Sequence, residues 1–159
     1  MQPRIVAAVI VVLLALAPLG LPEFYVTLLN YIGLFSLVTL GLVLLTGVGG
    51  LTSFGQAAFV GIGAYATAVL STKYGWSPWL NLAVALALAA AVALLIGFLT
   101  LRLSGHYLPL STIAWGISLY FLFGNFELLG GQTGISNLPA LNLFGLLLDT
   151  GRSFYYLIW

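Results

Sequence analysis

The stretch that sets the fold is Leu40–Leu70, which reads LGLVLLTGVGGLTSFGQAAFVGIGAYATAVL. Its first part is apolar and predicts a helix. This helix is expected to break at the glycines of Gly47–Gly50. A second apolar segment follows the more polar Thr52–Gln56. The pattern therefore predicts two helices joined by an irregular, glycine-rich connection.

The composition of the chain indicates that these helices lie in lipid. Hydrophobic residues make up 62% of the 159 residues and charged residues only 4%, whereas a soluble domain carries about 25% charged residues. The formal net charge of +1 and the absence of a basic stripe give no surface for nucleic acid. In a bilayer, irregular backbone persists only where protein or a watery cavity satisfies it. The glycine-rich connection is therefore expected to face the interior of a helix bundle.

The spacing of apolar runs predicts an all-α membrane protein. A membrane-crossing helix needs about 20 apolar residues, so the chain has room for four to five crossings in one transmembrane domain over residues 1–159. The expected spans lie near 5–21, 24–45, 52–70, 80–101 and 109–129, and another helix begins near 154. Because the sequence ends just after that start, we expect a chain truncated at its C-terminus. The alternative for the first run is a cleaved signal peptide.

Small residues on both sides of the break are typical of close helix packing. Ser53, Ala57 and Gly61 recur every fourth residue and would share one helix face, where a neighbouring helix can approach closely. Gly49 is assigned to the same packing role. Packing without a direct role in transport is the main interpretation for the glycines.

Three polar side chains in apolar surroundings are the candidates for a solute path. An amide or hydroxyl in hydrocarbon needs a partner, so it either bonds to another helix or lines a pathway. Both interpretations stay open for Gln56, and the residues expected to contact a solute are Asn30, Ser53 and Gln56.

Several chemical functions are excluded or disfavoured. The glycines of the break are not followed by the Lys-Ser or Lys-Thr pair of a phosphate loop. The chain has no cysteine and His106 is its one histidine, so no multi-histidine or thiolate metal site is expected. No serine, histidine and acid are spaced for nucleophilic catalysis, and we expect no catalytic residue.

Three segments in order resemble one family. Leu40–Leu70 closely resembles the first signature region of the LivM-type permeases of branched-chain amino acid ABC transporters. Leu101–Tyr107, LRLSGHY, resembles the arginine-glycine-aromatic turn of that family, and Leu129–Ile135, LGGQTGI, resembles its threonine-glycine-glycine loop. The resemblance covers about Gly33–Pro139. The matched turn and loop residues are Arg102, Gly105, Gly130, Gly131 and Gly134.

The resemblance implies a multi-pass permease subunit of the bacterial plasma membrane. It implies assembly with a second, LivH-like permease subunit, two cytoplasmic ATPase subunits and an extracytoplasmic substrate-binding protein. In that arrangement ATP hydrolysis on the partners drives alternating access, while the permease provides the path for branched-chain amino acids and holds no cofactor. Relatives of similar pattern import urea or short amides, so the solute stays open, and a membrane scaffold that transports nothing is the other alternative.

Two departures from the family pattern bear on coupling to ATP. Relatives often carry phenylalanine-glycine-glutamate where this chain has Trp115–Ser118, WGIS, so an acidic side chain common there is missing. The cytoplasmic loop that docks the ATPase in the family lies beyond the part that this chain matches. We therefore expect that this chain alone does not couple to ATP.

Overall fold

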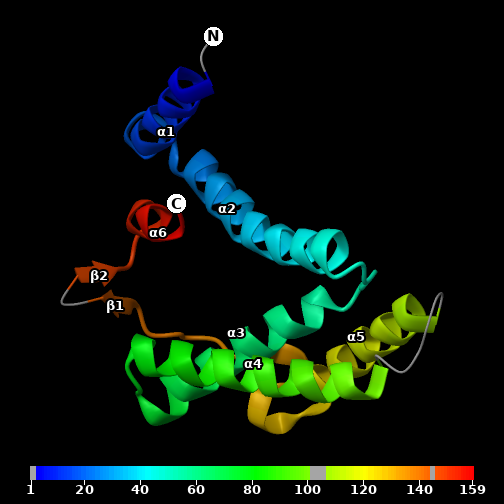
Figure 1. The fold of residues 1–159 in the computed structure, drawn as a ribbon. Coiled ribbons are helices and arrows are strands. Elements are labelled where there is room, and N and C mark those ends of the chain that lie inside the picture. Colours follow the sequence, from blue (N-terminus) through cyan, green and yellow to red (C-terminus); the bar gives the residue numbers. More distant parts are fainter. Residues whose placement is uncertain (1–2, 101–106, 144–145) are drawn as a thin grey trace. The chain divides into compact units, whose positions relative to one another are not determined.

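Helices dominate the architecture in a computed structural model of the chain, which describes residues 3–100, 107–143 and 146–159 (Figure 1). The contacts divide the chain into two compact units. One unit comprises Met1–Thr39 and Ala140–Trp159, and the other comprises Leu40–Pro139. Each unit is described by itself below, and the single transmembrane domain expected from the sequence stays a prediction.

The first unit combines the N-terminal helices with the C-terminal segment. Its elements are α1 (Pro3–Gly20), the first part of α2 (Glu23–Val43), β1 (Leu141–Leu143), β2 (Leu146–Leu148) and α6 (Gly151–Ile158). The two strands form an antiparallel hairpin in which Leu141 pairs with Leu148. This hairpin was not predicted, because its runs of leucine are short and no element was expected between residues 129 and 154. α6 begins three residues before the expected start near 154, where the Thr150 hydroxyl accepts a hydrogen bond from the Ser153 N–H at 3.2 Å.

Packing of α6 on α1 replaces a backbone hydrogen bond that a proline removes from α1. Pro18 lies inside α1 and has no N–H, so it cannot bond to the carbonyl of Leu14 one turn earlier. The hydroxyl of Tyr155 donates to that carbonyl at 2.7 Å. Tyr155 is almost completely buried, with 1% of its surface exposed. The tyrosine therefore supplies the hydrogen bond that the proline removes, which matters most where water is absent.

The second unit consists of three long helices and the connections around them. It contains the end of α2 with a π-helical turn (Leu44–Val48), α3 (Gln56–Tyr74), α4 (Pro78–Thr100), α5 (Tyr107–Asn125) and two 3₁₀ turns (Glu127–Leu129 and Gly131–Thr133). α3 packs mainly against α4 and also contacts α5. The helix expected over 109–129 ends at Asn125, because Phe126 is extended and Gly130 is left-handed, with φ of +82°.

A closed turn joins α3 to α4. Gly75 adopts φ of +63° and its N–H bonds to the carbonyl of Leu70, which ends α3. The side-chain amide of Asn81, in the first turns of α4, donates to the hydroxyl of Ser71 at 2.7 Å and to the carbonyl of Trp76 at 3.3 Å. Asn81 is 1% exposed. The amide therefore fixes the two helices at this end.

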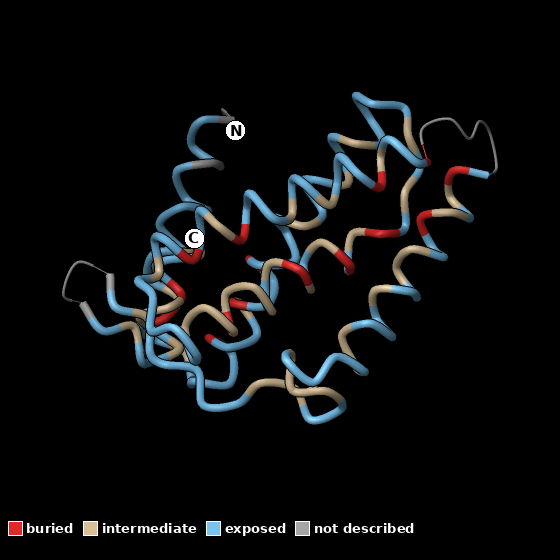
Figure 2. Tube along the Cα trace, turned by 90° about the horizontal axis from the view of Figure 1, so that it is seen from below, coloured by how far each residue is buried: buried red, intermediate tan, exposed pale blue. Residues whose placement is uncertain are grey.

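Some of the described helices have the length and composition of membrane spans. Three are long and apolar enough to cross a bilayer, namely Glu23–Val48, Pro78–Thr100 and Tyr107–Asn125, with mean hydropathies of 2.2, 2.8 and 1.3. Most positions along them are exposed, as lipid-facing helices require (Figure 2). The apolar stretch of α1 is shorter. α3 has 19 residues but carries Gln56 and Lys73 in its end turns. The expectation of a helical membrane protein with a glycine-rich break is confirmed.

Candidate functional site

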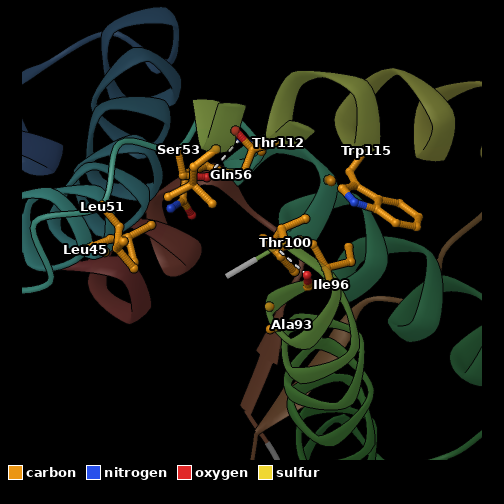
Figure 3. Close-up of a pocket in the computed structure, with 15 residues that line it drawn as sticks. Leu45, Leu51, Ser53, Gln56, Ala93, Ile96, Thr100, Thr112 and Trp115 are labelled. Carbon is orange, nitrogen blue, oxygen red and sulfur yellow. Dashed lines mark hydrogen bonds between the residues drawn. The ribbon is translucent and has the colours of Figure 1, made fainter. Parts of the chain in front are cut away.

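A cavity of about 320 Å³ lies in the second unit beside the glycine-rich break. Figure 3 shows its wall: Leu45 and Leu51 come from the break and the turn before it, and Ala93, Ile96 and Thr100 come from α4. Most of the lining is apolar. No charged residue is among the described residues that line it. The cavity therefore suits a small molecule with a substantial apolar part, and its wall offers neutral hydrogen-bonding groups to the polar end of that molecule.

The break itself forms one side of the cavity. After the π-helical turn, Gly50 takes a left-handed conformation with φ of +63°, and the chain then runs without regular structure until Gln56 begins α3. The N–H of Phe54 donates to the hydroxyl of Thr112 on α5 at 3.1 Å, and the N–H of Gly55 donates to the hydroxyl of Ser53 at 3.3 Å. Side chains thus satisfy backbone groups that a regular helix would have paired internally. The end of the break at Phe54 and Gly55 therefore contacts protein, as expected, whereas Gly47–Gly50 at its start are exposed.

Two of the three predicted path residues line this cavity. Ser53 and Gln56 lie on either side of Gly55 and both are half-buried. The side chain of Gln56 makes no hydrogen bond to any residue that the structure describes. An amide in apolar surroundings without a partner is costly, so Gln56 offers a donor and an acceptor to whatever occupies the cavity.

Three further lining residues on α4 and α5 were not singled out as path residues. Thr100 is buried, and its hydroxyl donates to the carbonyl of Ile96 at 2.6 Å. Thr112 is buried as well and contacts the break. Trp115 also lines the cavity. The sequence offered one signal for the two threonines, which is a hydroxyl in an otherwise apolar helix. It does not reveal which helix face turns toward the break.

Asn30 lies in the first unit and does not line the cavity. Its side-chain amide donates to the carbonyl of Gly151, at the start of α6, at 2.9 Å. The residue is 7% exposed, and its Oδ1 atom has no partner among the described residues. In the described structure, Asn30 holds α6 against α2.

The predicted packing residues lie in different environments. A Cβ atom on Gly61 would stand 2.6 Å from the ring of Phe123, so this glycine leaves room for that ring of α5 beside α3. Ala57 is exposed, whereas the adjacent Ala58 is buried. A Cβ atom on Gly49 would meet the carbonyl of Leu45 in its own turn. Ser53 precedes α3, which begins at Gln56. The groove expected of Ser53, Ala57 and Gly61 and the packing role of Gly49 stay predictions about neighbouring helices.

The loop glycines of the family pattern share one backbone property. Gly130, Gly131 and Gly134 all have positive φ, with values of +82°, +55° and +70°. A Cβ atom on Gly130 would collide with the carbonyl of Gly134. Only glycine fits such a turn without strain. Arg102 and Gly105, the residues of the predicted turn, lie outside the described residues.

The family model and the individual relatives that match the chain are all permease proteins of branched-chain amino acid transport systems. Residues 24–157 match the family described as branched-chain amino acid transport system / permease component. The chain is 41% identical over 114 residues to the high-affinity branched-chain amino acid transport system permease protein LivM of Escherichia coli (strain K12), and 40% identical over 114 residues to the protein of the same name from Salmonella typhimurium (strain LT2). Each alignment covers 71% of this chain and 27% of the relative. No solved structure matches the chain.

Proposed function

The chain belongs to the branched-chain amino acid transport system permease family, and from this membership we propose that it is a membrane-spanning subunit of an ATP-driven importer. Its solutes would be branched-chain amino acids, and the cavity beside the glycine-rich break would form part of their path. The chain would lie in the bacterial plasma membrane. Its partners would be a second, LivH-like permease subunit, two cytoplasmic ATPase subunits and an extracytoplasmic binding protein.

The observation that carries the proposal is the chemistry of the cavity. Its volume of about 320 Å³ is at the small end of ligand pockets, which span about 300–1,000 Å³. The apolar wall favours an aliphatic side chain, and the amide of Gln56 and the hydroxyl of Ser53 favour the polar end of the same molecule. Urea has no apolar group to place against Leu45, Leu51 and Ile96. The lining therefore favours a branched aliphatic amino acid over urea.

Uptake of labelled leucine tests the transport assignment. Cells that carry the intact gene are compared with cells that lack it, with unlabelled valine and unlabelled urea as competitors. We expect loss of uptake on deletion and competition by valine alone. Competition by urea would move the solute to the urea or amide class, and unchanged uptake would leave a membrane protein without this transport role.

Cysteine labelling tests whether the cavity is on the path. The chain has no native cysteine, so single cysteines can replace Ser53 and Gln56 and be treated with a charged thiol reagent. A cysteine at Leu94 is the control, because Leu94 is 76% exposed on an apolar helix and does not line the cavity. We expect reaction at both cavity positions, slower reaction in the presence of leucine, and no reaction at position 94. Inert cysteines at 53 and 56 would contradict the path.

A further inference from the structure

The hydroxyl of Thr112 connects the glycine-rich break to α5. Thr112 accepts a hydrogen bond from the N–H of Phe54 at 3.1 Å and donates one to the carbonyl of Pro109 at 2.8 Å. Phe54 and Thr112 are 58 residues apart in the sequence. Thr112 is 8% exposed, so water cannot easily take its place. The hydroxyl is therefore a point of attachment between two walls of the cavity.

Close backbone packing surrounds this hydrogen bond. A Cβ atom on Gly55 would stand 3.3 Å from the carbonyl oxygen of Thr112 and 3.7 Å from its Cβ atom. Gly55 is buried, and it lies between the two polar lining residues Ser53 and Gln56. The position of these two side chains thus depends on how the chain at Gly55 rests against Thr112.

Other threonines in the helices behave differently. The hydroxyls of Thr67, Thr72 and Thr100 each donate only to a carbonyl four residues earlier in their own helix. Among the described threonines, only Thr112 bonds to a segment distant in the sequence. Its hydroxyl is not needed to complete α5, because a helix forms without such side-chain bonds. The contact with Phe54 is what distinguishes it.

We infer that Thr112 is a positioning residue that holds the break so that Ser53 and Gln56 face the solute. This inference rests on the proposed function, because it assigns Thr112 a role in the same cavity. Without the hydroxyl, the N–H of Phe54 would be left unpaired in apolar surroundings. The break would then shift to find another partner, and the two polar side chains would move with it.

The test compares Thr112→Val, which keeps the shape and removes the hydroxyl, with Thr112→Ser, which keeps the hydroxyl. Thr67→Val is the matched control, because it makes the same change at a half-buried position bonded only to its own helix. Each variant is placed in the full transporter in native membranes, and leucine uptake is measured over a range of concentrations. We expect Thr112→Val to raise the half-saturating concentration about tenfold, the equivalent of one lost hydrogen bond. Thr112→Ser and Thr67→Val should stay near the unmodified value.

Labelling separates this inference from the proposal on which it rests. The rate at which a cysteine at position 56 reacts with a charged thiol reagent is measured with and without Thr112→Val. We expect a changed rate with Thr112→Val and an unchanged rate with Thr67→Val. An unchanged rate together with unchanged uptake would overturn the inference and leave the proposed path intact, whereas a cysteine that never reacts would overturn both.

The amount of protein in the membrane, measured by immunoblot, controls for loss of folding. If Thr112→Val does not accumulate, Thr112→Ala takes its place, because alanine is smaller and equally unable to accept the hydrogen bond. Failure of Thr112→Ser to restore the half-saturating concentration would also overturn the inference, since serine retains the acceptor.

Discussion

Removal of the Tyr155 hydroxyl is expected to destabilise the protein through a carbonyl on another helix. In Tyr155→Phe the ring stays and only the bond to the Leu14 carbonyl, 2.7 Å long, is lost. A buried carbonyl without a partner costs about 1–3 kcal/mol in general, whereas hydrogen bonds between membrane helices average about 0.6 kcal/mol. Because Pro18 leaves this carbonyl without its helical donor, we expect a loss of about 1–2 kcal/mol in the free energy of unfolding.

Equilibrium unfolding in mixed detergent micelles, followed by circular dichroism, measures this loss. Tyr156→Phe is the control: its hydroxyl bonds to the carbonyl of Ala15 at 3.2 Å, but the side chain is exposed and no proline lies four residues beyond Ala15. Its effect should be less than about 0.5 kcal/mol.

A double-mutant cycle with Pro18→Ala tests the reasoning itself. Alanine restores an N–H that can bond to Leu14, so Tyr155→Phe should cost about 1 kcal/mol less in that background. An equal cost of Tyr155→Phe in both backgrounds would refute the link between the proline and the tyrosine.

Glycine substitutions give three further predictions for the free energy of unfolding, measured in the same way. Gly61→Leu should cost about 1–3 kcal/mol because the side chain would meet a phenylalanine ring of α5. Gly63→Leu is the control and should be nearly neutral, because nothing lies within 4 Å of a Cβ atom at that position. Equal effects of the two substitutions would contradict this packing. Gly33→Ala should cost about 1–3 kcal/mol because the added methyl would overlap Ile158 of α6, and a neutral result would show that α6 does not rest there. Gly130→Ala should cost at least about 1–2 kcal/mol because alanine disfavours φ of +82°, and a stable variant would show that the loop adopts another backbone conformation.

Periodicity and composition were sufficient to predict the helices, but not the contacts between them. The break at Gly47–Gly50 and the spans near 80–101 and 109–129 were predicted within a few residues, because lipid demands long apolar runs and glycine ends them. The family resemblance, which the comparisons confirm, also came from residues close together in the sequence.

Contacts over long sequence distances explain what was missed. The roles of Thr112 and Tyr155 depend on partners 58 and 141 residues away, and no local pattern marks such pairs. Asn30 illustrates the same limit, because a polar residue in an apolar helix is consistent both with a path and with the bond to Gly151 that the structure describes. The hairpin at residues 141–148 was missed because short runs of leucine carry no distinct strand signal.

The closed turn between α3 and α4 has a consequence for how the chain enters the membrane during synthesis. Only residues 75–77 separate the two helices, and Asn81 ties them together. α4 is the most apolar of the described spans, with a mean hydropathy of 2.8, whereas α3 carries polar side chains at both ends. When the two helices insert together as a hairpin, their free energies of transfer into the bilayer add. The favourable transfer of α4 then offsets the less favourable transfer of α3. α3, which carries the half-buried amide of Gln56, can therefore remain less apolar than a lone span requires.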